Sequence, residues 1–188
     1  YGTGAAPNAQ VSWQIRHKMS DALVGRGRIR DSAGFVIEPR VVAFGGQFRI
    51  FAIGQGGFNR IGYLFIDPAA TQAVSESLTL LPGSVGNDTE WFDIALSPTS
   101  YCVSAVDNVA LQLGHLIFTQ AAPTALAFSQ YFAVNPTRHI GNAYMNSGGT
   151  GFGTGFVAFY SYAASLATAR WSGITTAGAA IPAGATAL

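Results

Sequence analysis

The chain has 188 residues, of which only 10% are charged and 49% are hydrophobic, and its formal net charge is +1. This length fits a single domain. No apolar run is long enough for a membrane-spanning helix, and the single Cys102 excludes an intrachain disulfide. So little charge indicates that partner subunits cover much of the surface, or that Ser, Thr, Asn, Gln and Gly supply its polarity.

The N-terminal region, residues 1–34, is expected to be an arm followed by a basic segment. Residues 1–10 are small and without periodicity, which predicts an extended arm. Residues 11–15 predict a short strand. Residues 16–24 are the part of this region that most favours a helix, and Gly25 and Gly27 would end that helix.

The clearest strand pattern lies in two runs joined by a glycine-rich turn. Residues 47–53 alternate with apolar side chains on both sides around Arg49, which predicts a strand covered on both faces. Residues 61–66 are apolar throughout, which predicts an inner strand of a packed sandwich. This region is the expected centre of an all-β domain.

Further runs and turn signals complete an all-β pattern at intervals of roughly 8 to 16 residues, typical of a sandwich or barrel. Strands are predicted at residues 35–37, 41–44, 78–81, 91–96, 101–106, 109–118, 126–134 and 152–162. Residues 69–77 predict one short helix. Residues 173–188, rich in Ala, Gly and Thr, predict an extended C-terminal tail without a core of its own.

No motif predicts catalysis, a cofactor or a metal site. The string around Ser84 lacks the spacing of a nucleophile elbow, and the glycines of residues 149–155 do not fit a dinucleotide loop. His17, His115 and His139 lie far apart without metal-ligand spacing. We therefore expect no enzyme and no cofactor.

Basic residues are concentrated at the N-terminal end. Residues 1–60 hold eight of the ten Lys and Arg and three acids, which gives +5, so the remaining 128 residues sum to −4. On an extended strand, alternate arginines of residues 26–30 project to one side and can straddle phosphates. The alternative is a solvated edge strand whose charges prevent aggregation. The predicted RNA-facing residues are Arg16, Lys18, Arg26, Arg28 and Arg30.

Several strings resemble the jelly-roll coat proteins of picornavirus-like viruses. FGGQFRIFAIG from Phe44 and FNRIGYLFIDP up to Pro68 are similar to the family's C and D strands, and WFDIALSP from Trp91 is similar to its E strand. LGHLIF from Leu113 and LAFSQYFAVN from Leu126 resemble the F and later strands. The length of the chain is closer to the small coat proteins of plant or algal members.

This resemblance implies an eight-stranded antiparallel jelly-roll β-sandwich over residues 35–172, with extended arms at both ends. It also implies a coat subunit that assembles with copies or sibling coat proteins into an icosahedral shell around RNA. Such a protein is found in the virion, which assembles in the host cytoplasm. The chain begins with Tyr1, so release from a polyprotein precursor is one open option.

Two other functions remain open at this point. A lectin-like recognition module would stack Trp171 and Tyr160 on sugars, whereas Trp13 and Trp91 suit a core or an interface better. A jelly-roll enzyme of the cupin type would need clustered histidines and carboxylates, and the scattered histidines make it remote.

Overall fold

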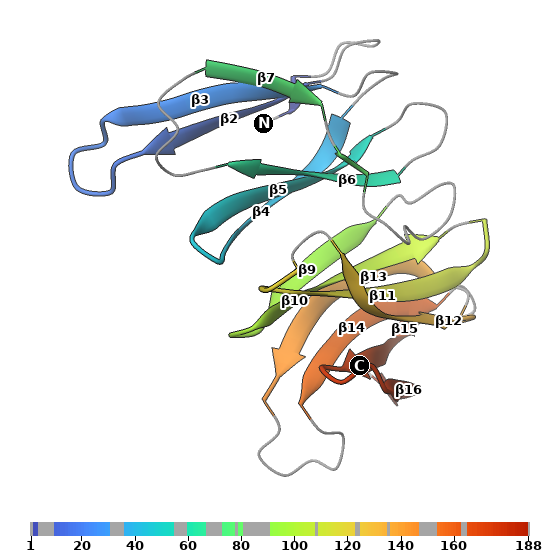
Figure 1. The fold of residues 1–188 in the computed structure, drawn as a ribbon. Helices are drawn as coiled ribbons and strands as arrows, with labels where there is room; N and C mark the ends of the chain where they lie inside the picture. Colours follow the sequence, from blue (N-terminus) through green and yellow to red (C-terminus); the bar gives the residue numbers. More distant parts are fainter. Residues whose placement is uncertain are drawn as a thin grey trace. The chain divides into compact units, whose positions relative to one another are not determined.

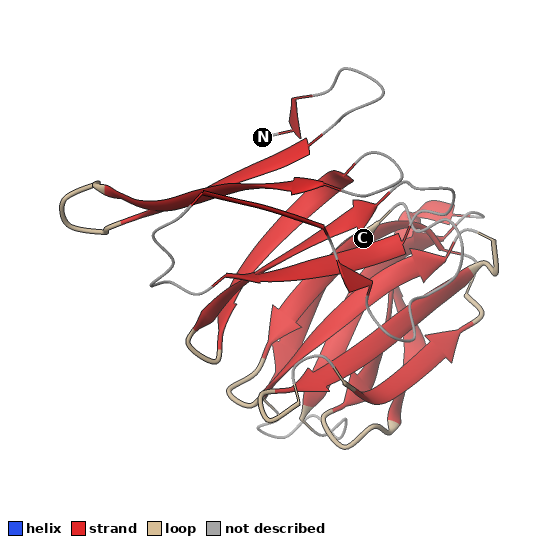
Figure 2. Ribbon diagram, turned by 45° about the horizontal axis from the view of Figure 1, so that its top comes forward, coloured by secondary structure: helices blue, strands red, loops and turns tan. Residues whose placement is uncertain are grey.

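Within the ranges that the computed structural model describes, all regular secondary structure is β-strand. These ranges are residues 2–3, 10–30, 36–54, 60–66, 73–77, 79–80, 91–107, 109–122, 125–134, 136–146, 154–162 and 165–187. Every regular element in them is a strand (Figure 2). The all-β prediction is therefore confirmed. The chain divides into two compact units, Tyr1–Leu81 and Pro82–Leu188.

The first unit has two four-stranded sheets (Figure 1). In spatial order, one sheet holds β1 (Gly2–Thr3), β2 (Gln10–Arg16), β3 (Leu23–Arg30) and β7 (Ala73–Ser77). The other holds β4 (Val36–Phe44), β5 (Gln47–Gly54), β6 (Arg60–Ile66) and β8 (Thr79–Leu80). Neighbouring strands are antiparallel except β3 and β7, which are parallel.

Apolar side chains from both sheets form the core of this unit. Trp13 and Ile29 come from the first sheet, and Ile50 is one of four buried residues from the second. The sheets therefore form a sandwich. As predicted, β5 is buried on both faces from Arg49 to Gly54.

A tight hairpin fixes the register of β4 and β5. Gly45 and Gly46 form its two-residue turn, with φ of 60° and 76°, and Phe44 pairs with Gln47 beside it. A two-residue turn with positive φ at both central positions matches the twist of the flanking strands. Glycine adopts such angles without steric penalty, which explains the Gly-Gly pair in the sequence.

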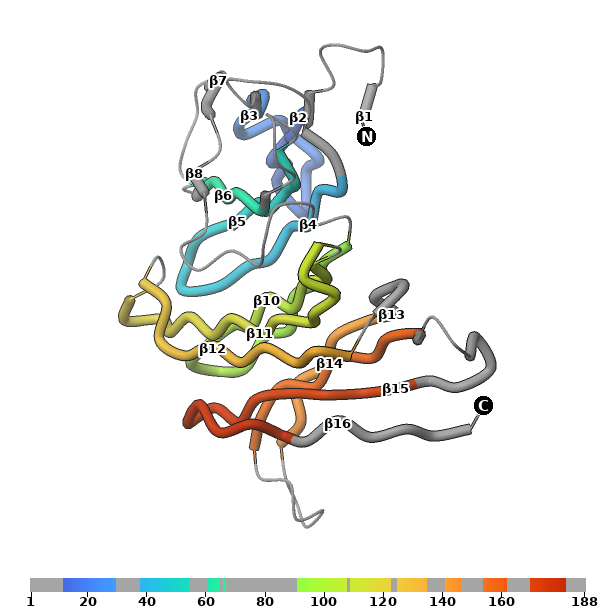
Figure 3. Tube along the Cα trace, turned by 90° about the vertical axis from the view of Figure 1, so that its right-hand side faces the viewer, coloured from blue at the N-terminus to red at the C-terminus, as the bar shows by residue number. Residues whose placement is uncertain are grey.

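The second unit also has two four-stranded sheets, both ordered as in the chain. One holds β9 (Phe92–Leu96), β10 (Ser100–Asp107), β11 (Gln112–Thr119) and β12 (Leu126–Phe132). The other holds β13 (Pro136–Met145), β14 (Gly155–Tyr162), β15 (Ser165–Thr175) and β16 (Ala180–Ala187). β15 pairs with β14 on one side and with β16 on the other. Figure 3 follows the chain from β14 into β15.

The core of the second unit also lies between its two sheets. Cys102 and Ile117 of the first sheet pack with Phe156 and Ile174 of the second. The described sheets hold four strands each, mostly in chain order, so the eight-stranded jelly roll is not confirmed. The boundary between the units also falls inside the predicted 35–172 domain.

Three segments differ from the sequence-based expectations. Residues 16–24 form a strand end, a turn and the start of β3 in place of a helical segment. Part of the expected helix at 69–77 is strand β7, because β3 offers it a parallel partner. The expected tail forms the end of β15 and all of β16, and Ile181 within it is only 1% exposed. The partner of β7 is distant in sequence, whereas β16 pairs with β15 across a short turn; in both cases the strand depends on its partner.

Close strand packing at Gly173 gives a testable prediction. A Cβ at this position would overlap the backbone carbonyl oxygen of Phe156. We expect Gly173→Ala to lower the free energy of unfolding by about 1–3 kcal/mol, since the backbone must shift to admit the methyl group. Urea denaturation measures it.

The matched control is Gly141→Ala in β13, where a Cβ meets no atom within 4 Å. This variant is expected to retain the stability of the parent protein or to exceed it slightly, because alanine restricts the unfolded chain. Equal stability of both variants would contradict the close packing between β14 and β15.

Candidate nucleic-acid interface

The two faces of the β2–β3 hairpin differ sharply in chemistry. Trp13 and Ile29 are buried on one face, whereas Gln14, Arg26 and Arg28 are exposed. Alternate residues of a strand point to opposite faces, so the sequence Arg-Gly-Arg-Ile-Arg separates arginines from glycine and isoleucine. Burial of the apolar face therefore turns the arginines outward.

The register of the hairpin brings polar residues of both strands together. Ser12 pairs with Arg28, and Gln14 pairs with Arg26. Directly paired residues of an antiparallel ladder lie on the same face. On the other face Trp13 pairs with Gly27, and this glycine puts no side chain beside the indole. The result is a polar face that crosses two strands.

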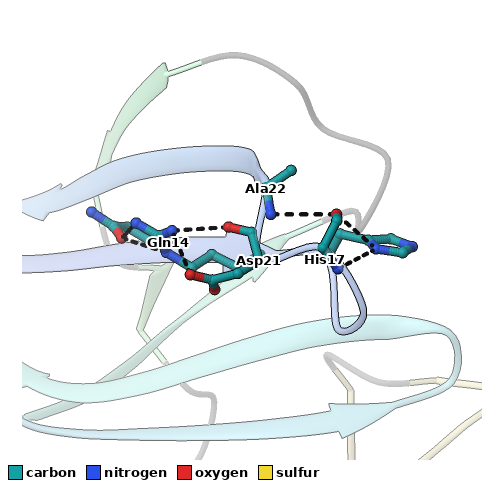
Figure 4. Close-up of polar contacts among 6 residues, drawn as sticks. Gln14, His17, Asp21 and Ala22 are labelled. Atoms are coloured by element: carbon teal, nitrogen blue, oxygen red, sulfur yellow. Dashed lines mark hydrogen bonds and ion pairs between the residues drawn. The ribbon is translucent and has the colours of Figure 1, made fainter.

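Hydrogen bonds from Arg16 connect Gln14 with Asp21 at the tip of the hairpin. Figure 4 labels these two partners, Gln14 and Asp21. Its Nη1 donates to the carbonyl oxygen of Asp21 at 2.9 Å and to Asp21 Oδ2 at 3.3 Å, while Nε and Nη2 donate to Gln14 Oε1 at 3.3 Å. Asp21 has a φ of 53°, so the turn requires a left-handed residue there. Because the ion pair is exposed, it contributes only about 0–1 kcal/mol.

The rest of the turn is closed by short-range hydrogen bonds. The backbone N–H of Asp21 donates to the carbonyl oxygen of His17 at 2.9 Å, and the N–H of His17 donates to the carbonyl oxygen of Ala22 at 2.9 Å. The His17 ring lies on Ser20, with 3.1 Å between His17 Nδ1 and Ser20 Oγ. His17 therefore belongs to a structural turn.

The five predicted RNA-facing residues have different positions in this hairpin. Arg26 and Arg28 are exposed on the polar face, and neither has a hydrogen bond or an ion pair within the described part of the chain. Arg16 is exposed but already bonded to Gln14 and Asp21, and Lys18 lies exposed in the turn. Arg30 ends β3, and its side chain lies outside the described residues.

The residues that pair with Arg26 and Arg28 on the neighbouring strands are uncharged. The parallel strand β7 places Ala73 beside Arg26 and Ser75 beside Arg28. Arg26 and Arg28 are two residues apart on one strand, so their Cα atoms are about 7 Å apart. Two guanidinium groups at this spacing, with no partner among the described residues, suit successive phosphates of an extended strand. The described side chains of this face include no aromatic ring to stack on bases.

A second polar cluster lies inside the second unit, and sequence reasoning missed it. His115 is fully buried; its Nδ1 lies 2.8 Å from Ser104 Oγ and its Nε2 lies 3.0 Å from Ser172 Oγ. Ser104 pairs with His115 across β10 and β11, while Ser172 belongs to β15 of the other sheet. The imidazole therefore joins the two sheets.

This cluster resembles a serine–histidine pair in its distances but not in its setting. Ser104, His115 and Ser172 are all 0% exposed, so a substrate has no path to them. A neutral imidazole donates through one nitrogen and accepts through the other, and a serine hydroxyl can meet either need. The cluster satisfies buried polar groups between the sheets. Its only sequence signal was a histidine inside an apolar run.

The residues of the alternative functions are mostly inaccessible or dispersed. Tyr160 is fully buried, so it cannot stack on a sugar, and Trp171 is half-buried. Trp13 is a core residue, as predicted. His17 is exposed, His115 is buried, and the side chain of His139 lies outside the described residues. Within the described ranges, no group of three His, Cys, Asp or Glu side chains is placed to hold a metal ion.

No family model matches the chain, and no curated protein matches it in sequence. The resemblance to picornavirus-like coat proteins therefore stays a prediction. Among the described residues, no helix has the length and apolar character needed to cross a bilayer.

Cys102 gives a prediction about reactivity. Burial raises the pKa of its thiol from 9.0 to about 12, although Ser104 and Asn142 lower it through hydrogen bonds. Since the thiolate is the nucleophile, this rise lowers the reactive fraction at neutral pH about 1000-fold. We expect no reaction of the folded protein with a disulfide reagent at about pH 8, and complete reaction in concentrated guanidinium chloride.

A Met19→Cys variant supplies the control, because Met19 is 87% exposed in the turn between β2 and β3. It should react with one equivalent of reagent in the folded state. Rapid labelling of Cys102 in the folded parent protein would show that the second unit opens readily.

Proposed function

We propose that this chain is a coat subunit that assembles with copies or sibling coat proteins into an icosahedral shell enclosing RNA. The observation that carries the proposal is the polar face of the β2–β3 hairpin. Arg26 and Arg28 are held outward there by a buried core on the opposite side. A subunit that packages a genome needs such sequence-independent attraction to phosphates. In this proposal the face lies toward the interior of the virion.

Exposed apolar side chains support assembly. Val41 and Val109 are 61% and 68% exposed, and the aromatic Phe128 and Tyr131 of β12 are 40% and 43% exposed. Only 10% of the residues are charged, so few charged side chains are available to interrupt these apolar positions on the surface. Subunit contacts would remove such side chains from water, which favours association through the hydrophobic effect.

The proposal requires rigid β-sandwich wedges but not a particular strand order. In the jelly roll of the coat-protein family that the sequence resembles, Greek-key connections place strands that are not consecutive in the chain next to each other. The described sheets instead follow chain order for the most part. Each sandwich still presents loops and strand edges from a fixed core, which is the property that a shell uses.

Electron microscopy tests the proposal directly. The chain, expressed alone and together with sibling coat proteins from the same precursor, is expected to form closed shells of uniform size that protect RNA from nuclease. Sedimentation of the parent protein at several concentrations measures how the assembled fraction depends on concentration. A chain that stays monomeric and free of shells under every one of these conditions would reject the coat function.

Salt titration of RNA binding tests the arginine face. We expect Arg26→Gln and Arg28→Gln each to reduce the slope of log affinity against log salt by about 0.7, because each removes one phosphate contact on a single strand. The double variant should reduce it by about 1.4 with little dependence on RNA sequence. Fluorescence anisotropy with labelled single-stranded RNA measures both.

Arg40→Gln is the matched control, since it removes the same charge from β4, where Arg40 lies 3.4 Å from Glu38. Its slope should equal that of the parent chain. Equal losses in all three single variants would mean that net charge, and not this face, attracts RNA.

A further inference from the structure

The first sandwich has an open apolar groove at one side. Its volume is about 200 Å³. The residues that line it are Trp13, Gln14, Ile15, Arg16, Val41, Phe48, Ile50 and Ile66. Six of these eight side chains are apolar, and all eight belong to the first unit. The groove therefore exposes part of the core between the two sheets.

One residue that lines the groove faces the opposite sheet but is exposed to solvent. Val41 pairs with Ile50 across β4 and β5, so both lie on the face that packs against the other sheet. Ile50 is 2% exposed, whereas Val41 is 61% exposed. The sheet opposite therefore covers β5 but leaves β4 uncovered at Val41.

Among the described residues, the outer edge of β2, beside the groove, is paired with another strand only at one end. β1 pairs with β2 only at Gln10 and Val11. From Ser12 to Arg16, the only strand beside β2 within the described residues is β3, on its other side. The free edge spans five residues, or about 17 Å. A strand placed along it would continue the line of β1 and cover Val41.

We propose that a second copy of the chain supplies this strand from its residues 1–9, whose Gly2 and Thr3 exchange the pairing with their own β2 for this one. The added strand pairs through its backbone with the edge of β2 from Ser12 to Arg16, and its inward side chains lie over Val41. Strand addition of this kind gains affinity from main-chain hydrogen bonds and specificity from the side-chain groove.

Three observations favour this segment as the occupant. The same strand β2 already pairs with this segment within one chain, at Gln10 and Val11, next to the free part of its edge. The chain has no charged residue before Arg16, which suits a groove whose floor is apolar. Residues 1–9 include two glycines and three alanines, whose side chains need little room in a groove.

The indole N–H of Trp13, which lines the same groove, needs a hydrogen-bond acceptor. Its Nε1 is buried and has no acceptor within the described part of the chain. A buried donor without a partner is unfavourable. A carbonyl oxygen of the added strand provides an acceptor once the side chains at the groove adjust.

Mixed disulfide formation tests the proposal on the full chain. One protein carries Val41→Cys, and another, enlarged by a fusion tag, carries Ala5→Cys. Neither chain can form an internal bridge, because its only other cysteine is the buried Cys102. Mild oxidation of the mixture should give the mixed dimer at least about tenfold above the control, identified by its size on a non-reducing gel.

The control pairs Ala5→Cys with Val109→Cys, because Val109 is a comparably exposed valine, at 68%, in the second unit. A synthetic peptide of residues 1–10 should suppress the mixed dimer of the first pair and leave the control unchanged. Equal yields from the two pairs would overturn the proposal, and so would a peptide without effect. Circular dichroism verifies that each variant keeps its strand content.

The inference rests on the proposed self-assembly, but the two can fail separately. A mixed dimer without shells would reject the coat function and retain the strand addition. Shells that form without the specific mixed dimer would retain the coat function and reject this contact.

Discussion

The structure depends on one constraint: an arginine cannot enter an apolar core without an unfavourable loss of hydration, and strand geometry places every second residue on the same face. In β3 this constraint fixes the orientation of the whole hairpin. Ile29 packs in the core, so Arg28 must face outward, and a register slip by one residue would exchange them. The core and the candidate interface are therefore two faces of the same two strands. Neither face can change without the other.

Arg49 shows what a buried arginine needs in this protein. It is 2% exposed, and its guanidinium lies 4.6 Å from the centre of the Phe44 ring. The ring face attracts the cation, and the hairpin turn at Gly45 and Gly46 brings the two residues to the same end of their sheet. Arg26 and Arg28 have no aromatic ring among the described side chains on their own face of the hairpin. Their exposure follows from the same physics.

Local patterns predicted the strands whose own residues determine burial. The alternation around Arg49 predicted a strand covered on both faces, and the arginine spacing predicted one basic side. Sequence could not predict β7 or β16, because their residues are small and weakly apolar and become strands only beside β3 and β15. It also could not predict the His115 cluster. Ser104 and Ser172 lie 11 and 57 residues away along the chain, and only the packing of two sheets brings them together.

Scarcity of charge also affects two strand edges of the first unit, those of β4 and β2. Natural sheets protect their edges with charges, bulges and short strands. The edge strand β4 has such protection at one end, where Glu38 and Arg40 form an ion pair next to a register shift. From Val41 to Phe44 the same strand carries no charge. Along β2 the only charge is that of Arg16, which Asp21 already balances. Residues 41–44 of β4 and 10–15 of β2 therefore have no charge of their own to prevent edge pairing, and charge protects these two strands only at Glu38, Arg40 and Arg16.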